Sequence, residues 1–418
     1  MASRRKPGLS PPPRLHPAQD SGPSYTDPTR SEDRGHMAGP LSDIRIIELA
    51  GLGALPYGSL RLADMGAEVI RVERLADVPP PADRTPRRYS SWDRGRRSIA
   101  VDLKHPDGIE TLLRLVDDAD VFLEAFRPGV AERLGVGPDE LLHRKPDLVY
   151  GRLTGWGQTG RLAPTAGHSL NYEAITGVID AIGPRGAGPV PLLQLLGDFA
   201  GGGLTLAYGV MCALWEARRS GQGQVIDVAM TDGVASIASV FYGMQAGGHH
   251  FPERGTNLFD GGAPFYNVYE CADGRYLSVA PIEGHFYAQF LALIGLGAAE
   301  LPEQYDQDRW PELTERIADV IRTRTRDEWA EAFEQTDCCV APVLTFDEAR
   351  AYGHHQDRET FVDGGPEIVP IPRLSRTPGE LDGRSPRWPG ADTDEVLAHA
   401  GWTPEEIAGL RAAGVIDG

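Results

Sequence analysis

The chain has 418 residues, of which 41% are hydrophobic, 8% aromatic and 24% charged, a balance typical of a soluble protein with a large core. With 41 basic and 60 acidic residues it carries a formal net charge of -19 at pH 7, which disfavours nucleic acid and anionic membranes as main partners. Its four cysteines include no Cys-x-x-Cys, so we expect reduced thiols, a cytoplasmic location and no disulfide framework.

Residues 1–36 are rich in Pro, Ser, Arg and Asp and show no apolar periodicity. The segment lacks the apolar centre of a secretory signal, so it is interpreted as a disordered extension or an upstream mis-start. In the second case Met37 is the true first residue.

From Ile44 onward, apolar strand patterns alternate with helical ones, which predicts a parallel sheet covered by helices. Ligands of such sheets gather at the carboxyl ends of the strands. We expect strands at 44–49, 69–72, 121–124, 148–153 and 225–230, and helices at 55–65, 106–117 and 138–144. The apolar run 199–215 predicts a buried core helix opened by Asp198, because glycines interrupt it and it is short for a membrane span.

The pattern changes near residue 265, where two strand signals flank the turn Asp273-Gly274. Helical signals follow at 285–294, 310–323 and 327–334, so we expect a second, smaller α+β domain at 265–354. The large domain is predicted at 37–229, completed by 373–418, with linkers at 230–264 and 355–372. A capping box, Thr403 to Glu406, begins a C-terminal helix that we expect to pack on the large domain.

His168 and Asp198 are the strongest candidates for chemistry in this chain. Each lies beside flexible glycine, and an imidazole with a carboxylate can move a proton on and off a carbon atom. Spacing alone favours the plainer interpretation of a loop histidine and a helix cap.

Three other signals are weaker. Gly51-x-Gly53, with Glu73 twenty residues on, resembles a dinucleotide fingerprint, but Pro56 stands where its third glycine belongs, so a tight turn explains the glycines. The histidine pairs 249–250 and 354–355 lack further ligands at metal spacing, so we expect no metal, and no Gly-x-Ser-x-Gly elbow supports a serine hydrolase. A ligand with several phosphates and a solvated charged loop are equal explanations for a cluster of cations. The cluster has nine members within 34 residues: Arg71, Arg74, Arg84, Arg87, Arg88, Arg94, Arg96, Arg97 and Lys104.

Four stretches resemble the family III coenzyme A transferases: residues 66–73 (GAEVIRVE), 126–129 (FRPG), 154–160 (TGWGQTG) and 221–230 (GQGQVIDVAM). Three more closely resemble the α-methylacyl-CoA racemases of that superfamily: 166–168 (AGH), 197–199 (GDF) and 260–266 (DGGAPFY). The spacing of thirty residues between His168 and Asp198 agrees with the racemases, and the resemblance extends from Met37 to about Thr377.

The resemblance implies an α/β fold with a Rossmann-like large domain and a smaller α+β domain, in an interlocked homodimer. It implies an isomerase of lipid metabolism that interconverts the (2R) and (2S) forms of 2-methyl-branched acyl-CoA thioesters and needs no cofactor beyond the coenzyme A of its substrate. His168 and Asp198 would be the two catalytic bases. Glu283, from the small domain of the other subunit, would support the histidine.

The resemblance also assigns binding residues. Arg74, Lys104, Arg127 and Arg133 would contact coenzyme A, and Met230 and Tyr266 the acyl chain. A soft, flexible methionine side chain suits acyl groups of varied shape.

Ser169 stands where family III transferases carry a nucleophilic aspartate, and a serine cannot form their acyl anhydride. Proton transfer is therefore the favoured chemistry. Two alternatives remain: a family III transferase that moves coenzyme A between carboxylic acids, and a non-catalytic acyl-CoA-binding homologue.

Overall fold

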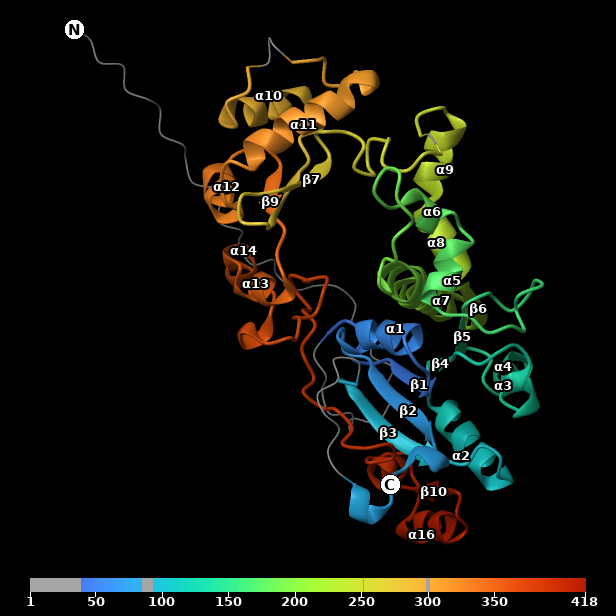
Figure 1. The fold of residues 1–418 in the computed structure, drawn as a ribbon. Helices are drawn as coiled ribbons and strands as arrows, with labels where there is room; N and C mark the ends of the chain where they lie inside the picture. The colour runs from blue at the N-terminus through green and yellow to red at the C-terminus, as the bar shows by residue number, and fades with distance from the viewer. Residues whose placement is uncertain (1–38, 85–92, 251, 298–300) are drawn as a thin grey trace. The chain divides into compact units, whose positions relative to one another are not determined.

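The computed structural model describes residues 39–84, 93–250, 252–297 and 301–418 (Figure 1). The segment Met37–Gly418 forms one compact unit. The extension predicted at 1–36 lies outside the described residues.

A seven-stranded sheet forms the centre of the larger part of this unit, with the strand order β10-β3-β2-β1-β4-β5-β6. All neighbouring strands are parallel except β10, which pairs antiparallel with β3. The strands are β1 (Arg45–Leu49), β2 (Glu68–Arg74), β3 (Arg96–Val101), β4 (Val121–Glu124), β5 (Val149–Thr154), β6 (Gln224–Ala229) and β10 (Ile416–Asp417). The predicted parallel sheet is confirmed. Two of its strands are missing from the prediction: β3, whose first two residues are arginines, and the two-residue β10.

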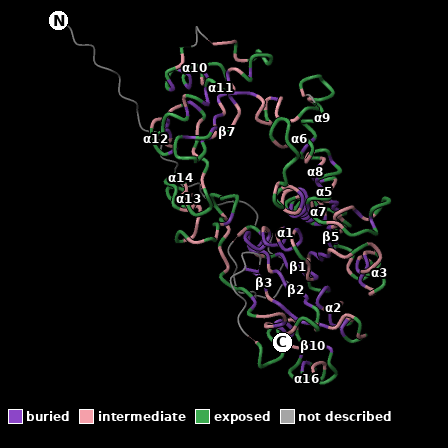
Figure 2. The backbone as a smooth tube through the Cα atoms, viewed as in Figure 1, coloured by how far each residue is buried: buried purple, intermediate pink, exposed green. Residues whose placement is uncertain are grey.

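Helices cover both faces of the sheet, as the near-continuous apolar character of its strands requires (Figures 1 and 2). Because successive side chains point to opposite faces, Ile46 packs with α1 (Ala54–Ala63) and α7 (Thr205–Ser220), while Ile47 packs on the other side. The helices of that second face are α2 (Pro106–Asp117), α4 (Pro138–Arg144), α15 (Thr393–His399) and α16 (Pro404–Ala412). The C-terminal segment thus packs against a sheet whose other strands, β1 to β6, come earlier in the sequence.

The helix predicted to open at Asp198 begins earlier, at Leu195. Its first ten residues form a π-helix, η3 (Leu195–Leu204), which continues into α7. The combined helix Leu195–Ser220 is long and apolar enough to pass a compositional test for a membrane span, a test that core helices also pass. The predicted core helix is buried on one face only: Leu206 and Val210 lie in the core, whereas Tyr208 and Trp215 are 72% and 76% exposed.

Glycines allow η3 to cross its neighbours at very close range. A methyl group on Gly203 would lie 2.9 Å from the backbone nitrogen of Gly58 in α1. One on Gly233 of α8 (Met230–Ile237) would lie 2.0 Å from the carbonyl oxygen of Gly201. The triple glycine 201–203 is therefore a packing requirement that fixes the start of the helix against two others.

Short helices fill the connections around this crossing. They are α3 (Val130–Arg133), α5 (Ser169–Ala174), α6 (Val178–Ala181) and α9 (Ser239–Ala246). Single 3-10 turns occur at η1 (Leu75–Asp77), η2 (Pro81–Asp83), η5 (Gln307–Arg309) and η6 (Val362–Gly364).

The predicted α+β elements of the C-terminal half are confirmed. The hairpin β7 (Asn267–Glu270) and β8 (Tyr276–Val279) is extended by β9 (Val340–Pro342) into a three-stranded antiparallel sheet. It shares a separate core, centred on Phe290 and Trp329, with α10 (Gly284–Leu293), α11 (Trp310–Ile321) and α12 (Arg326–Phe333). Two short helices follow, α13 (Phe346–Ala351) and α14 (Gly353–Asp357).

Candidate active site

The fold brings His168 and Asp198 together from two different helices. His168 is the residue before α5, and Asp198 lies in the first turn of η3. Burial raises the pKa of the Asp198 carboxyl above its ordinary value, the charge of Glu173 raises it further, and His168 lowers it. The two candidate bases are thus within electrostatic reach of each other, in a partly desolvated site.

Gly53 provides the room for the Asp198 carboxylate. Gly53 has a φ of 66° and precedes α1, directly after the turn that follows β1. A methyl group built on it would lie 2.7 Å from Oδ2 of Asp198. The second glycine of the Gly51-x-Gly53 pattern is therefore needed for a close approach of a side chain, as well as for a tight turn.

Two backbone N–H groups at Asp198 and its neighbour are occupied by side chains. The Asp198 N–H donates to Ser169 Oγ at 3.2 Å. The Gly197 N–H donates to Glu173 Oε1 at 2.8 Å. Both donors are therefore occupied by side chains of α5.

Glu173 is a functional candidate that was missed in the sequence. Its side chain is completely buried, and its Oε1 also accepts a hydrogen bond from Ser169 Oγ at 2.8 Å. The signal available was the i, i+4 spacing of Ser169 and Glu173 on one helix, which places both on one face. Burial could not be inferred from that spacing.

Tyr172 lies within electrostatic reach of both Asp198 and the cationic Arg127. Its hydroxyl donates to the Gly167 carbonyl, and its ring meets the edge of Trp156 at 4.7 Å between centroids. Burial raises the pKa of Tyr172, the charge of Asp198 raises it further, and Arg127 lowers it. Arg127, predicted to contact coenzyme A, is thus close enough to act on the same phenol as Asp198.

A cavity of about 1150 Å³ lies at the carboxyl ends of β1, β2 and β3. Arg74 and Lys104, two of the predicted coenzyme A contacts, line it together with Phe126. Gly53 lines the same cavity and also touches Asp198, so it links the cavity to the candidate bases. This is the position at which parallel α/β sheets bind ligands, and the volume suits a large cofactor-sized molecule.

The four predicted coenzyme A contacts are exposed, as cations that meet a ligand must be. Arg74 forms an ion pair with Asp77 at 2.8 Å. Within the described part of the chain, no carboxylate pairs with Lys104, Arg127 or Arg133. In a protein of net charge -19 these three cations retain their capacity for phosphate.

Most of the basic cluster stabilises the fold, which neither of the two explanations drawn from the sequence included. Five of its arginines form ion pairs within the fold: Arg71 with Asp93, Arg84 with Asp417, Arg94 with Asp64, Arg96 with Glu48 and Arg97 with Glu68. Arg96 is 2% exposed, so its charge requires such a partner. Arg87 and Arg88 lie outside the described residues.

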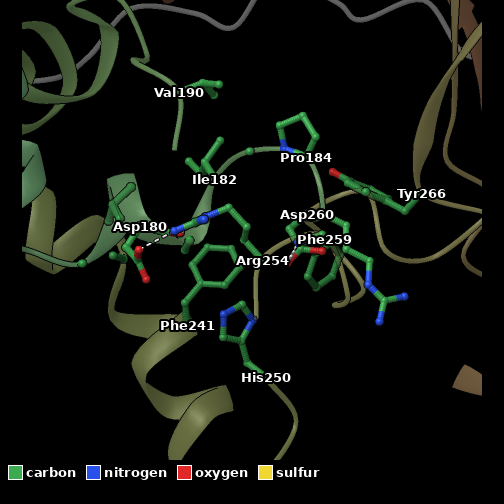
Figure 3. A pocket seen from close by; sticks show the side chains of 18 of the residues that line it. Asp180, Ile182, Pro184, Val190, Phe241, His250, Arg254, Phe259, Asp260 and Tyr266 are labelled. Carbon is green, nitrogen blue, oxygen red and sulfur yellow. Dashed lines mark hydrogen bonds and ion pairs between the residues drawn. The ribbon is translucent and has the colours of Figure 1, made fainter. Parts of the chain in front are cut away.

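The two predicted acyl contacts lie in different surroundings. Met230 begins α8 and packs on η3, where its Cγ is 3.2 Å from a methyl group built on Gly202. Tyr266 stacks edge-on against Phe259 and lines a second cavity of about 1070 Å³ (Figure 3). Figure 3 also shows Arg254 reaching across this cavity toward Asp180. Neither candidate base lines this second cavity or the first one, which Asp198 approaches only through Gly53.

Glu283 is placed away from the histidine that it was expected to support. It precedes α10 in the α+β part of the chain, where burial and then its charge raise the pKa of Cys339. Among the described residues of one chain, the structure records no interaction between Glu283 and His168. The support of His168 by Glu283 of another subunit stays a prediction.

Comparison with known proteins places these features in context. Residues 41–393 match the model of CoA-transferase family III. Alpha-methylacyl-CoA racemases of Mus musculus and Homo sapiens are 43% and 41% identical over 380 residues, covering 90% of this chain and 97% of each relative. Succinyl-CoA--D-citramalate CoA-transferase of Chloroflexus aurantiacus is 31% identical over 400 residues, covering 90% of this chain and 98% of the relative.

A solved structure agrees with these matches. The crystal structure of a CAIB/BAIF family protein from Brucella suis has a TM-score of 0.74 and 26% identity, covering 87% of this chain and all of the other. The resemblance inferred from the motifs is confirmed by these comparisons.

Proposed function

The chain belongs to CoA-transferase family III, and we propose that it is an isomerase that interconverts the two α-epimers of 2-methylacyl-CoA thioesters. One observation carries the proposal. The Asp198 carboxylate, within electrostatic reach of His168, faces Gly53, and Gly53 lines the cavity at the carboxyl ends of the strands.

The reaction moves one proton at a time. One base takes the α-hydrogen of the thioester, the C–H electron pair forms an enolate, and the conjugate acid of the other base protonates the opposite face. His168 and Asp198 share one exchangeable proton before and after turnover, so their functions reverse for the other epimer. The raised pKa of Asp198 makes this carboxyl a stronger proton acceptor than an ordinary aspartate.

The surrounding fold favours the enolate. Asp198 lies at the amino end of the 26-residue helix Leu195–Ser220, whose dipole favours negative charge there. This chemistry needs only acid and base groups, so we propose that no cofactor takes part beyond the coenzyme A of the substrate.

We assign the phosphate-bearing part of the substrate to the cavity at the strand ends. Lys104, Arg127 and Arg133 would pair with its phosphates, and Arg74 would exchange its partner Asp77 for one of them. Met230, next to η3, would contact the acyl chain, with Tyr266 contributing from another segment. We also propose a cytoplasmic location and a place in lipid metabolism, which fit an acyl-CoA substrate.

An interlocked homodimer would complete the site. Exposed apolar side chains lie on α7 (Tyr208 and Trp215) and α9 (Val240 and Phe241), and a partner would bury them. Glu283 of one copy would then reach His168 of the other. In this assembly the large domain is 37–229 with 373–418, the small domain is 265–354, and the segments 230–264 and 355–372 join them.

Transfer of coenzyme A between acids is the weaker candidate. That chemistry needs an accessible carboxylate nucleophile, and residue 169 is a serine. The nearby Glu173 carboxylate is completely buried and holds two hydrogen bonds, so it cannot attack a thioester.

The proposal is tested with one pure epimer of a 2-methylacyl-CoA in deuterium oxide. Racemisation gives loss of optical purity together with deuterium at the α-carbon, and His168→Ala or Asp198→Asn should lower the rate by about 100-fold or more. Glu405→Gln, an exposed acid on α16, serves as the control and should match the wild type. Movement of coenzyme A to a second carboxylic acid without α-deuteration would establish a transferase, and binding without either reaction a non-catalytic homologue.

A further inference from the structure

Glu173 is a completely buried acid beside the catalytic pair, and proton transfer by His168 and Asp198 gives it no task. It forms no ion pair with a described cation. Its Oε2 is buried and accepts no hydrogen bond from a described residue. Burying a carboxylate without a cation is costly, so its retention here needs a cause.

Its contacts all lead to Asp198. Glu173 Oε1 accepts from the Gly197 N–H and from Ser169 Oγ, each at 2.8 Å. Ser169 Oγ in turn accepts from the Asp198 N–H at 3.2 Å. One carboxylate oxygen therefore holds two successive residues of η3, one directly and one through a hydroxyl.

The packing leaves little freedom for another arrangement. A methyl group on Gly197 would lie 2.4 Å from Ser169 Oγ and 2.9 Å from Glu173 Oε1, so only glycine allows this approach. On the other side of η3, the Asp198 carboxylate faces Gly53. A shift of this first turn would change how the carboxylate approaches Gly53.

We propose that Glu173 is a positioning residue for proton transfer, acting through Ser169 and the Gly197 N–H to fix the Asp198 carboxylate and to maintain a negative charge beside it. This inference rests on the proposed racemase function. The charge of Glu173 disfavours ionisation of Asp198, and the hydrogen bonds hold the group that must take up and release the proton. Ser169 has a defined task in this arrangement, because its hydroxyl both donates and accepts.

Glu173→Gln separates charge from geometry. The amide oxygen can still accept both hydrogen bonds, while the negative charge is lost. In both reaction directions the active enzyme carries one proton on the pair His168 and Asp198, so kcat/KM follows a bell-shaped pH profile. Its acid limb reports the lower of the two pKa values of this pair. Loss of the charge should move this limb to lower pH and reduce kcat by about tenfold, with KM changed less than about twofold because the substrate contacts remain.

The second variant, Ser169→Ala, changes the geometry at Asp198 and keeps the charge of Glu173. It also tests the proposal if Glu173→Gln folds poorly. It removes the acceptor of the Asp198 N–H and leaves the Glu173 carboxylate in place. We expect a lower kcat with the acid limb unmoved. Equal shifts of the limb in both variants would overturn the proposed division of tasks.

A rescue experiment asks whether the position of the charge matters. Ser169→Asp alone places two carboxylates together in a buried site and should destabilise the protein. Combined with Glu173→Gln, it returns one negative charge to the same helix face, where it can accept the Asp198 N–H directly. The double variant should recover the wild-type acid limb, and no recovery would contradict a positional function of the charge.

A titration that needs no turnover separates this inference from the proposed function. The Asp198 carboxyl is followed by ¹³C NMR in protein labelled at aspartate, with its signal assigned by Asp198→Asn. Glu173→Gln should lower the pKa of Asp198, and Glu405→Gln should leave it unchanged. If Glu173→Gln leaves the Asp198 titration unchanged, the inference is overturned, even where the wild type racemises its substrate. If the wild type shows no α-deuteration, the proposed function is overturned, and the titration still decides the inference.

Discussion

Gly53 shows how one residue couples binding and catalysis. It lines the cavity at the strand ends, and its missing side chain makes room for the Asp198 carboxylate. Its φ of 66° adds a second requirement for glycine. Substitution at this position therefore tests whether the observed approach of Asp198 matters for activity.

Gly53→Ala should reduce kcat by about 100-fold, because the added methyl group displaces the base from its position. The measurement is kcat for racemisation, with the melting temperature followed in parallel. Gly274→Ala is the matched control: Gly274 has a φ of 73° and no atom within 4 Å of an added methyl group. It also places a side chain at positive φ, at a cost of about 1 kcal/mol, but without a clash, and it should keep full activity. Equal losses of activity would show that strain alone explains the effect.

Lys104 tests the placement of the phosphates. Lys104→Ala should raise KM about tenfold with kcat nearly unchanged, as expected when one charge-assisted hydrogen bond to the substrate is lost. Lys145→Ala, which breaks an ion pair with Asp147 elsewhere on the surface, controls for a loss of net charge. A fall in kcat at constant KM would remove Lys104 from the binding site.

At the scale of single residues, the candidate site could be predicted only in part. His168 and Asp198 were found because glycines and family motifs surround them. Glu173 was not, because a buried acid and an exposed helical acid look the same in a sequence. The buried arginines of the basic cluster misled for the same reason, since their partners Asp64 and Glu48 lie far away in the chain.

At the scale of elements, the crossing of η3 with α1 and α8 determines where Asp198 lies. The strands β1, β4 and β5 and the helices α2 and α4 were predictable, because apolar period and turn residues mark them locally. The start of η3 and strand β3 were not. Both depend on tertiary contacts: glycine packing in η3, and buried ion pairs that allow Arg96 to enter the sheet.

Gly233→Ala should destabilise the protein by about 1–3 kcal/mol, because the new methyl group overlaps the carbonyl oxygen of Gly201. The loss should appear in urea unfolding, with activity reduced as η3 shifts. Gly409→Ala in α16, where nothing lies within 4 Å, is the matched helical control and should be neutral or stabilising. Equal stability of the two variants would contradict close packing at the crossing.

At the scale of the whole molecule, the proposal requires two copies of the chain. Glu283 belongs to the α+β part, and no contact joins it to His168 among the described residues of one chain. The exposed apolar faces of α7 and α9 are the surfaces that a partner would cover.

Co-expression of His168→Ala with Glu283→Gln tests this arrangement. If Glu283 serves the site of the other subunit, half of the dimers are mixed and each has one intact site, so about a quarter of wild-type activity should return. Each variant expressed alone is the control and should have little activity. Recovery no greater than the mean of the two separate variants would show that both residues act within one chain.

The central claim is that His168 and Asp198 act on opposite faces of one α-carbon. The direct test incubates each pure epimer in deuterium oxide with each single variant and follows α-deuteration without inversion. His168→Ala should deuterate only the epimer whose hydrogen faces Asp198, and Asp198→Asn only the other epimer. Deuteration of the same epimer by both variants would contradict the account.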